Sequence, residues 1–458
     1  MLVRDMRRLA LIVGPIMLLF LIGAGIYGTD ADDTIRDQIT SLLQKTYPSD
    51  QSPLPEDVDD DSPLAINPLA GDIGSGTHHE IASASTPNGM YFNMTFGKHV
   101  AFNPNIIPHP DPNKTDTYII VAQKKHPAKV SGKPDPSVFH VEIGCEAAFV
   151  DGVLQCLDDP ETLPIAATPG NMCKEPIDFL GHNVGPHDAR VFYGPDKPYT
   201  LFYSNSRYSC WGMWLQDFRV LVDWNHKLFF EEDFRMATEV QRPPPVGVVE
   251  KNFFMFWDAD DQIYAHYDMF PKRSFAKMKV DGSVGKDLAS KTQEKDKKCL
   301  SRYLPEPKFD PSKDEFGQPE SIHQATNSLK ITLCNRTDPS CKPTASNTFL
   351  FTIIHFKRYY NFHSEYEPYV VMFQQRQPFE VWGVSPKPIW INGRKHLENK
   401  KTELFYITSM SWKGKEQKYH GYLDDALFLA FGIEDSRSGG IDVTAGELLK
   451  GMGLCSEA

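Results

Sequence analysis

A carboxylate and a guanidinium stand close together in the segment 185–190, which reads Gly-Pro-His-Asp-Ala-Arg. Asp188 and Arg190 are two positions apart, so on an extended chain both side chains point to the same side. Such a pair can hold two sugar hydroxyls, or the arginine can neutralise a carboxylate. A structural ion pair that closes a turn is the alternative interpretation.

Three other places offer groups for the same chemistry. The segment 250–252, Glu-Lys-Asn, supplies a phosphate-compatible cation in Lys251 and an amide in Asn252, with a charged strand edge as the alternative. His323 and His355 each adjoin an apolar run, where a histidine is a candidate acid or base but is often structural. Asp435 follows the last apolar run and is a candidate general base, or else a turn residue.

One acidic motif is better explained by a turn than by a metal. Residues 258–260 read Asp-Ala-Asp, the pattern with which many nucleotide-sugar transferases hold a divalent cation. Here the motif is expected at a hairpin tip, where aspartate is favoured by turn geometry. We therefore predict no metal site. The sequence also lacks a nucleophilic Gly-x-Ser-x-Gly elbow and a phosphate-binding glycine loop.

The elements that must position these residues are predicted to be strands. Runs rich in β-branched and aromatic residues, bounded by turn residues, predict strands at 118–122, 190–193, 199–204, 253–257, 262–267, 349–355, 369–373, 404–409 and 426–431. Strand pairs begin near residues 118, 190, 253, 349 and 404, which predicts five small sheets. We expect an all-β, five-bladed β-propeller. A β-sandwich is usually smaller, and a Rossmann-type sheet would need alternating helices. One helix is expected after the capping box Thr444-x-x-Glu447.

Composition narrows the class of protein. The 458 residues carry a net charge of −12, which argues against a nucleic-acid partner. With 41% hydrophobic and 24% charged residues, most of the chain can bury a core. Aromatic residues reach 12%, and 35 prolines and 31 glycines favour short strands and turns over a helical bundle.

The N-terminal region predicts how the chain is anchored. After a basic tail (1–8), residues 9–29 are free of charge and long enough to cross a bilayer. The basic flank predicts a cytoplasmic N-terminus and a translocated body, hence a single-pass type II protein of the Golgi or another secretory-pathway membrane. A cleaved signal peptide is the alternative. A short helix is expected at 34–47 within an acidic, proline-rich stem (30–75), and the folded domain at 76–458.

Cysteines and glycosylation motifs agree with a translocated body. Eight cysteines are compatible with four disulfides, and Cys145–Cys156 and Cys334–Cys341 are the predicted short loops. Their spacing is not that of a zinc site. Three Asn-x-Thr motifs begin at Asn93, Asn113 and Asn335.

Four short segments, in this order, resemble those of two related families. The segments are 102–105 (Phe-Asn-Pro-Asn), 185–190, 250–252 and 431–435 (Phe-Gly-Ile-Glu-Asp). They resemble the β-mannoside phosphorylases, which are five-bladed propellers, and the fungal β-1,2-mannosyltransferases. The phosphorylases usually have Glu-Asp-Pro-Arg in the second segment. Here His187 and Ala189 replace the Glu and the Pro, whereas Asp188 and Arg190 remain.

The resemblance implies transfer of mannose from GDP-mannose, with inversion and a β linkage, to a mannoside or glycan acceptor in the secretory pathway, as in mannan or cell-wall synthesis. It implies that Asp188 and Asp435 are the catalytic residues and that substrate is bound by Asn103, His187, Arg190, Lys251, Asn252, His323 and His355. It implies no certain cofactor and leaves a Mn²⁺ requirement open. A glycoside hydrolase or phosphorylase on the same propeller and a non-catalytic carbohydrate-binding propeller are the alternatives.

Overall fold

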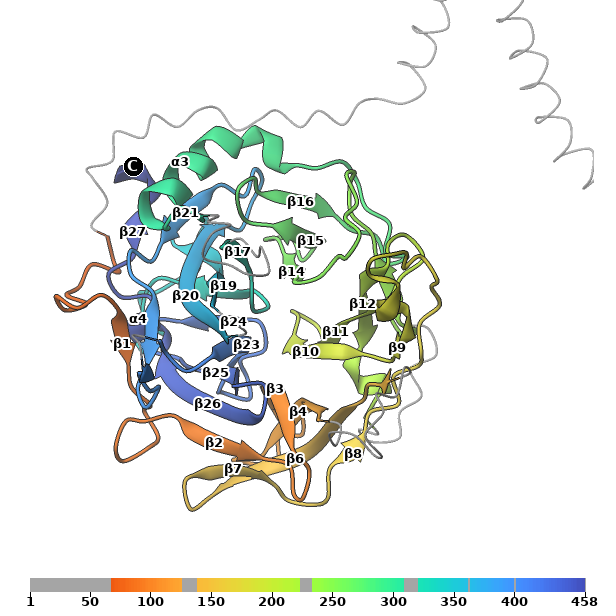
Figure 1. Ribbon diagram of the computed structural model, residues 1–458. Helices are drawn as coiled ribbons and strands as arrows, with labels where there is room; N and C mark the ends of the chain where they lie inside the picture. Colours follow the sequence, from red (N-terminus) through yellow and green to blue (C-terminus); the bar gives the residue numbers. More distant parts are fainter. Residues whose placement is uncertain are drawn as a thin grey trace, which may run out of the picture. The chain divides into compact units, whose positions relative to one another are not determined.

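The computed structural model describes residues 67–125, 138–222, 233–308, 320–360, 363–398 and 401–457. Within these residues the chain is built mainly of antiparallel strands. Figure 1 shows the sheets following one another in chain order around a common centre. This radial arrangement agrees with the predicted all-β propeller class.

The largest sheet contains the first and the last long strands of the described chain. Its nine strands are, in spatial order, β23 (Phe405–Trp412), β25 (Ala426–Ile433), β26 (Arg437–Thr444), β2 (Phe92–Thr95), β7 (Val153–Cys156), β6 (Glu142–Val150), β4 (Tyr118–Lys124) and β3 (Ala101–Pro108), with β8 (Glu161–Thr162) on β6. β2 is antiparallel to β26 and parallel to β7. An early strand thus joins a late one, which closes the ring.

Three further sheets complete the ring. One contains β10 (His187–Tyr193), β11 (Pro198–Asn205), β12 (Trp211–Asp217) and β13 (Thr238–Val240). The next contains β14 (Phe254–Trp257), β15 (Ile263–Asp268) and β16 (Ser274–Lys277). The seven-stranded sheet contains β24 (His420–Tyr422), β18 (Leu329–Thr332), β19 (Thr348–Tyr360), β20 (His363–Gln374), β21 (Val381–Val384) and β27 (Gly453–Leu454), with β17 (Ser321–Gln324) on β19.

Short elements fill the remaining described chain. Two parallel pairs are β1 (His79–Ile81) with β22 (Ile389–Ile391) and β5 (Val138–Phe139) with β9 (Asn183–Val184). The helices are α3 (Gln293–Tyr303), α4 (Ala445–Leu448) and the 3₁₀ turns η1 (Asp178–His182), η2 (Phe218–Val220), η3 (Ala289–Lys291) and η5 (Cys455–Glu457). The Thr444 hydroxyl accepts from the Glu447 N–H, so the predicted capping box is confirmed. α3 was missed because only Asp296, Cys299 and Leu300 are buried on it, too few for an apolar stripe.

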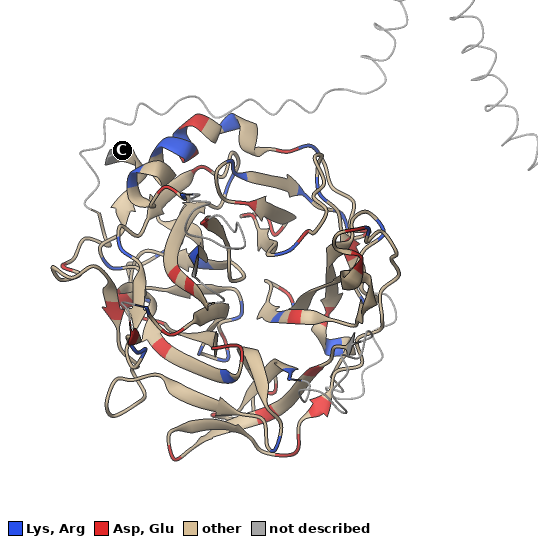
Figure 2. Cartoon of the chain, in the orientation of Figure 1, with Lys and Arg blue, Asp and Glu red and all other residues tan. Residues whose placement is uncertain are grey.

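The core lies between neighbouring sheets, which explains the long apolar runs. All seven residues of β12 are buried, because the sheets on either side cover both of its faces. One cluster of buried side chains extends from Phe192 through Met255 and Leu350 to Phe431, so four sheets share it. Figure 2 shows acidic and basic residues interspersed along the strands and the connecting loops.

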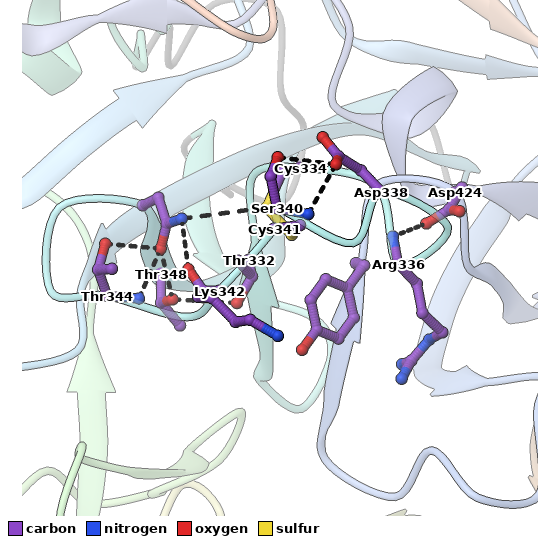
Figure 3. The surroundings of a disulfide bond; sticks show 12 residues. Thr332, Cys334, Arg336, Asp338, Ser340, Cys341, Lys342, Thr344, Thr348 and Asp424 are labelled. Atoms are coloured by element: carbon purple, nitrogen blue, oxygen red, sulfur yellow. Dashed lines mark hydrogen bonds between the residues drawn. A yellow bond between two sulfur atoms is a disulfide. The ribbon is translucent and has the colours of Figure 1, made fainter.

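Four disulfides tie segments together, and both predicted pairs are confirmed: Cys145–Cys156 and Cys334–Cys341. The other two are Cys173–Cys210 and Cys299–Cys455. Figure 3 shows the small loop closed by Cys334–Cys341. In it, Ser340 donates twice to the Asp338 carboxylate (2.9 and 2.7 Å), and the Arg336 N–H donates to Asp424 (2.6 Å).

The predicted Golgi or secretory-membrane location needs correction. Among the described residues there is no helix both long and apolar enough to cross a bilayer. The longest, α3, has 11 residues, which span only ~16 Å. The basic tail, the predicted anchor at 9–29, the helix at 34–47 and most of the predicted stem belong to residues 1–66, which lie outside the described residues.

Candidate active site

Four of the residues predicted to act in catalysis or binding have left-handed backbone conformations. The φ angles are 54° at Asn103, 47° at Asp188, 61° at Asn252 and 44° at Asp435. Each lies in or next to a different strand: β3, β10, β14 and β25. Positive φ costs a non-glycine residue about 1–3 kcal/mol and clusters at functional sites. Ten described non-glycine residues have positive φ, and these four are predicted site residues of the two types, asparagine and aspartate, that adopt this conformation most readily.

The Asp188 carboxylate is fixed by two donors. The Asn103 amide donates to Oδ1 at 2.6 Å, and the Tyr203 hydroxyl donates to Oδ2 at 2.6 Å. Burial, followed by the charge of Asp188, raises the pKa of Tyr203 well above its ordinary value, so Tyr203 remains a donor. The carboxylate therefore has one orientation, as a group that must position a substrate requires.

The backbone around Asp188 is held by buried side chains of the neighbouring sheet. The pairing of β10 with β11 shifts register between His187 and Arg190, which leaves a bulge. The N–H groups of residues 188 and 189 in the bulge, and of residue 191 just after it, find side-chain acceptors: Gln123 (3.0 Å), Glu142 (3.2 Å) and Asn105 (3.0 Å). These three side chains thus hold the backbone in and beside the bulge.

Glu142 is the unusual member of this group. It is completely buried, and its Oε2 atom has no hydrogen-bond partner within the described structure. Burial raises its pKa to about 8; the Ala189 N–H opposes the rise, and the charge of Asp188 adds to it. Glu142 is therefore protonated at neutral pH, because an unpaired buried carboxylate would be costly.

A small pocket of about 10 Å³, room for about one water molecule, adjoins Asp188 between the sheets of β10 and β14. Three predicted residues line it: Asp188, Arg190 and Asn252. The prediction that Asp188 and Arg190 point to one side agrees with this lining. Arg190 donates to the Thr408 carbonyl at 2.9 Å and its guanidinium lies 5.3 Å from the centre of the Tyr406 ring. The Tyr406 hydroxyl in turn donates to Asn252 at 3.3 Å, which links both sides of the pocket.

Asp435 lies beside this arrangement without lining the pocket. Gly432 brings its loop close to Asn103: a Cβ at Gly432 would be 2.3 Å from the Asn103 Oδ1 atom. The Lys125 ammonium donates to the Asp435 carbonyl at 3.0 Å. Burial and the charges of Asp188 and Glu434 raise the pKa of Asp435, although more than a third of its surface is exposed. Asp435 thus holds a proton at a higher pH than an ordinary aspartate.

A cationic group lies on the side of β17 and β19. Burial and the charge of Lys251 lower the pKa of Lys357. Burial lowers the pKa of His323 to about 4, and Lys251 and Lys357 add to this. His323 is therefore neutral at neutral pH, with its Nδ1–H donating to the Gln324 carbonyl at 2.9 Å. The positive charge that could meet a phosphate comes from the two lysines.

His187 and His355 are placed behind the site. The His187 ring stacks on Tyr203 with 5.2 Å between the ring centres, and it is buried. His355 is completely buried against Tyr406 (4.7 Å), and burial, followed by repulsion from His323 when that ring is protonated, lowers its pKa well below the ordinary value. Neither lines the pocket. In these positions the His187 ring packs against Tyr203 and the His355 ring packs against Tyr406.

The Asp-Ala-Asp motif forms the expected hairpin tip. The Asp258 carboxylate accepts from the N–H groups of Asp260 and Gln262, both at 2.9 Å, and from the Tyr264 hydroxyl at 3.1 Å. These three hydrogen bonds engage the Asp258 carboxylate in stabilising the turn. Among the described residues there is no group of three or more cysteine, histidine or acidic side chains placed to bind a metal ion.

Several residues of the site were not predicted from the sequence. Tyr203 and Tyr406 lie inside predicted strands, where aromatic residues are expected anyway. Gln123, Glu142 and Asn105 are polar residues in buried strands. The rarity of buried polar residues is the one signal that could have identified them, once burial is known.

Comparison with known proteins gave no family. No family model and no curated protein matches the sequence. Among solved structures, a β-1,2-mannobiose phosphorylase from Listeria innocua gives a TM-score of 0.43 at 11% identity, covering 84% of this chain and 96% of that one. MPT-1, a GDP-Man-dependent mannosyltransferase from Leishmania mexicana, gives 0.35 at 8% identity, covering 77% and 89%. An exo-1,5-α-L-arabinanase from a bovine ruminal metagenomic library gives 0.34 at 7%, covering 76% and 95%.

Proposed function

We propose that this chain is a carbohydrate-active enzyme that transfers a mannosyl group from GDP-mannose to a mannoside acceptor, with inversion and a β linkage. The observation that carries the proposal is the fixed Asp188 carboxylate at the wall of a pocket, with Asp435 on one side and Lys251 and Lys357 on another. Carboxylates and an arginine suit sugar hydroxyls, and lysines suit a diphosphate.

Each group has a role in a direct displacement. Asp188 and Arg190 hold the hydroxyls of the mannosyl group, and Asn252 adds an amide. Asp435, with its raised pKa, takes the proton of the acceptor hydroxyl as that oxygen bonds to the anomeric carbon. The bond from that carbon to the phosphate oxygen breaks, and GDP leaves with the electron pair. Lys251 and Lys357 stabilise the charge that develops on it.

The test is an assay of the purified chain with GDP-mannose and a mannoside acceptor, with and without Mn²⁺. We expect the acceptor to be lengthened by one β-linked residue at a time. Other nucleotide sugars in the same panel serve as controls. Absence of transfer from GDP-mannose under all conditions would refute the transferase proposal.

A phosphorylase is the second candidate, because the same lysines could hold inorganic phosphate. In that reaction phosphate attacks the anomeric carbon, and a protonated carboxyl gives its proton to the departing sugar oxygen. The raised pKa of Asp435 is compatible with this acid role. Incubation of mannobiose with phosphate distinguishes the two: a phosphorylase releases mannose 1-phosphate, and a hydrolase releases mannose without consuming phosphate.

We also propose that the ring has five blades. If the nine-stranded sheet is divided between β2 and β7, it gives two four-stranded units, β23-β25-β26-β2 and β3-β4-β6-β7. With the three other sheets these make five. The four predicted site residues with positive φ then come from four different blades, as expected for a site at a propeller centre.

A further inference from the structure

A second pocket, of about 70 Å³, lies next to the one that contains Asp188. Phe253 lines both pockets and separates them. The second pocket is formed by the chain that follows β11, by the end of β13 and by Glu250, the residue before Lys251. It therefore opens beside the same ends of the strands that present Asp188 and Asn252.

An exposed aromatic side chain stands at this second pocket. Tyr208 is 52% exposed, and its hydroxyl accepts from the Gln241 amide at 3.1 Å. Its loop is rigid: the Tyr208 N–H donates to the Ser206 hydroxyl at 2.9 Å, and the Cys173–Cys210 disulfide follows two residues later. Exposed tyrosines that are held rigidly give contact area at small entropic cost, because they have few rotatable bonds.

The charges of the second pocket differ from those around Lys251. It is lined by the carboxylates of Glu239 and Glu250 and by one cation, Arg242. Arg242 donates to Glu250 at 3.0 Å and to Asp268 at 2.5 Å, so its charge is already compensated. Its buried Nε atom has no hydrogen-bond partner in the described part of the chain. A phosphate would be repelled here, whereas a neutral ligand with hydroxyls could meet both donors and acceptors.

We propose that the second pocket is a subsite for a neutral saccharide, in which the acceptor chain lies against Tyr208 and extends away from the reacting hydroxyl at the pocket of Asp188. The proposal rests on the proposed function for the placement of the two substrates. The phosphate-bearing donor binds on the side of Lys251, and the neutral acceptor binds on the side of Glu239. The saccharide-binding site itself is independent of which reaction the enzyme performs.

The test compares Tyr208→Ala with Tyr208→Phe, using linear mannose oligosaccharides of increasing length. We expect Tyr208→Ala to raise KM for acceptors of three or more residues about tenfold, because an aromatic contact is worth roughly one factor of ten. The kcat value, KM for GDP-mannose and KM for a single-residue acceptor stay unchanged. Tyr208→Phe keeps the ring and stays near the wild type. Leu157→Ala, an equally exposed apolar position on the β7 side, is the control.

Calorimetry of oligosaccharide binding keeps the proposal testable if the chain transfers no sugar. Binding that weakens in Tyr208→Ala and survives in Tyr208→Phe would support the subsite even where the proposed reaction fails. Equal binding and equal KM values for long acceptors in wild type and Tyr208→Ala would overturn it. If Tyr208→Ala does not fold, Tyr208→Leu, which keeps an apolar side chain but removes the aromatic ring, should give the same length-dependent loss.

Discussion

The Asn103 amide donates to the Asp188 carboxylate at 2.6 Å although the two residues are 85 positions apart and belong to different sheets. Both have positive φ, and both lie where a register shift interrupts the pairing of their strand. A strained residue on one sheet therefore fixes the orientation of a strained residue on the next. The following predictions test what this arrangement does.

Asp188→Asn should reduce kcat/KM by about 10² to 10³, because the amide cannot accept from both Asn103 and Tyr203 or present a negative charge to the sugar. The fold should survive, since asparagine tolerates the left-handed backbone found at Asp188. Steady-state kinetics together with thermal unfolding measures both effects. A variant with the full rate would show that Asp188 is not a catalytic residue.

Glu434→Gln should shift the acidic limb of the kcat/KM profile to lower pH. Asp435 accepts a proton only when it is deprotonated, so its raised pKa delays the rise of activity as pH increases. The charge of Glu434 contributes to the raised pKa of Asp435. Glutamine at position 434 removes this charge, and its Oε1 atom can still accept from the Leu404 N–H, as that of Glu434 does (2.8 Å). Glu434→Asp, which keeps the charge, is the control. An unshifted limb would exclude Asp435 as the group that the profile reports.

Lys251→Met should raise KM for a phosphate-bearing substrate about tenfold or more, with little effect on binding of a neutral mannoside. Removal of this charge should also raise the pKa of Lys357, which Lys251 now lowers. Titration of the lysines by NMR and donor kinetics check the two parts. Lys98→Met, at a lysine that is 75% exposed, gives the background effect of losing one positive charge.

Glu142→Gln should change how stability depends on pH. Because the folded pKa of Glu142 is about 8 and its ordinary value is 4.5, the folded protein binds this proton more tightly than the unfolded chain does. The stability that Glu142 contributes is complete below its ordinary pKa and is lost as pH rises through the folded value, by about 1.4 kcal/mol per pH unit within that window.

Glutamine is a neutral mimic of the protonated acid and can still accept from the Ala189 N–H. The variant should therefore lose this slope and gain stability over wild type toward pH 8. Urea unfolding at a series of pH values measures the difference. If wild type and variant change in parallel, Glu142 does not bind a proton on folding.

Removal of Cys299–Cys455 should destabilise the protein more than removal of Cys334–Cys341. The two bonds close loops with sequence separations of 156 and 7 residues. Loop entropy in the unfolded chain gives about 5 and about 2.5 kcal/mol, respectively. Paired serine variants in denaturant unfolding check this order. The short bond should chiefly affect the loop of Figure 3. Arg336 of this loop also forms a bidentate pair with Asp425 (2.9 and 2.7 Å). The reverse order of stability losses would contradict the loop-entropy account.

The sequence alone predicted those features that depend on near neighbours. Buried strands such as β4 and β10 follow from runs of apolar residues between turn residues, and the hairpin tip at the Asp-Ala-Asp motif follows from its aspartates. The short-loop disulfides were predictable because their cysteines are close in the chain. The order of the polar segments selected Asn103, Asp188 and Asn252; the structure places Asn103 in contact with Asp188, and Asp188 and Asn252 at one pocket.

Tertiary structure decided everything that depends on which distant groups become neighbours. The sequence gives no reason for Gln123, Glu142 and Asn105 to bond to the bulge around Asp188, because they reach it from another sheet. It cannot distinguish a charged histidine from a neutral one, and burial makes His323 neutral. Protonation and orientation are set by desolvation and by partners far away in the chain, which exist only once the sheets have closed into a ring.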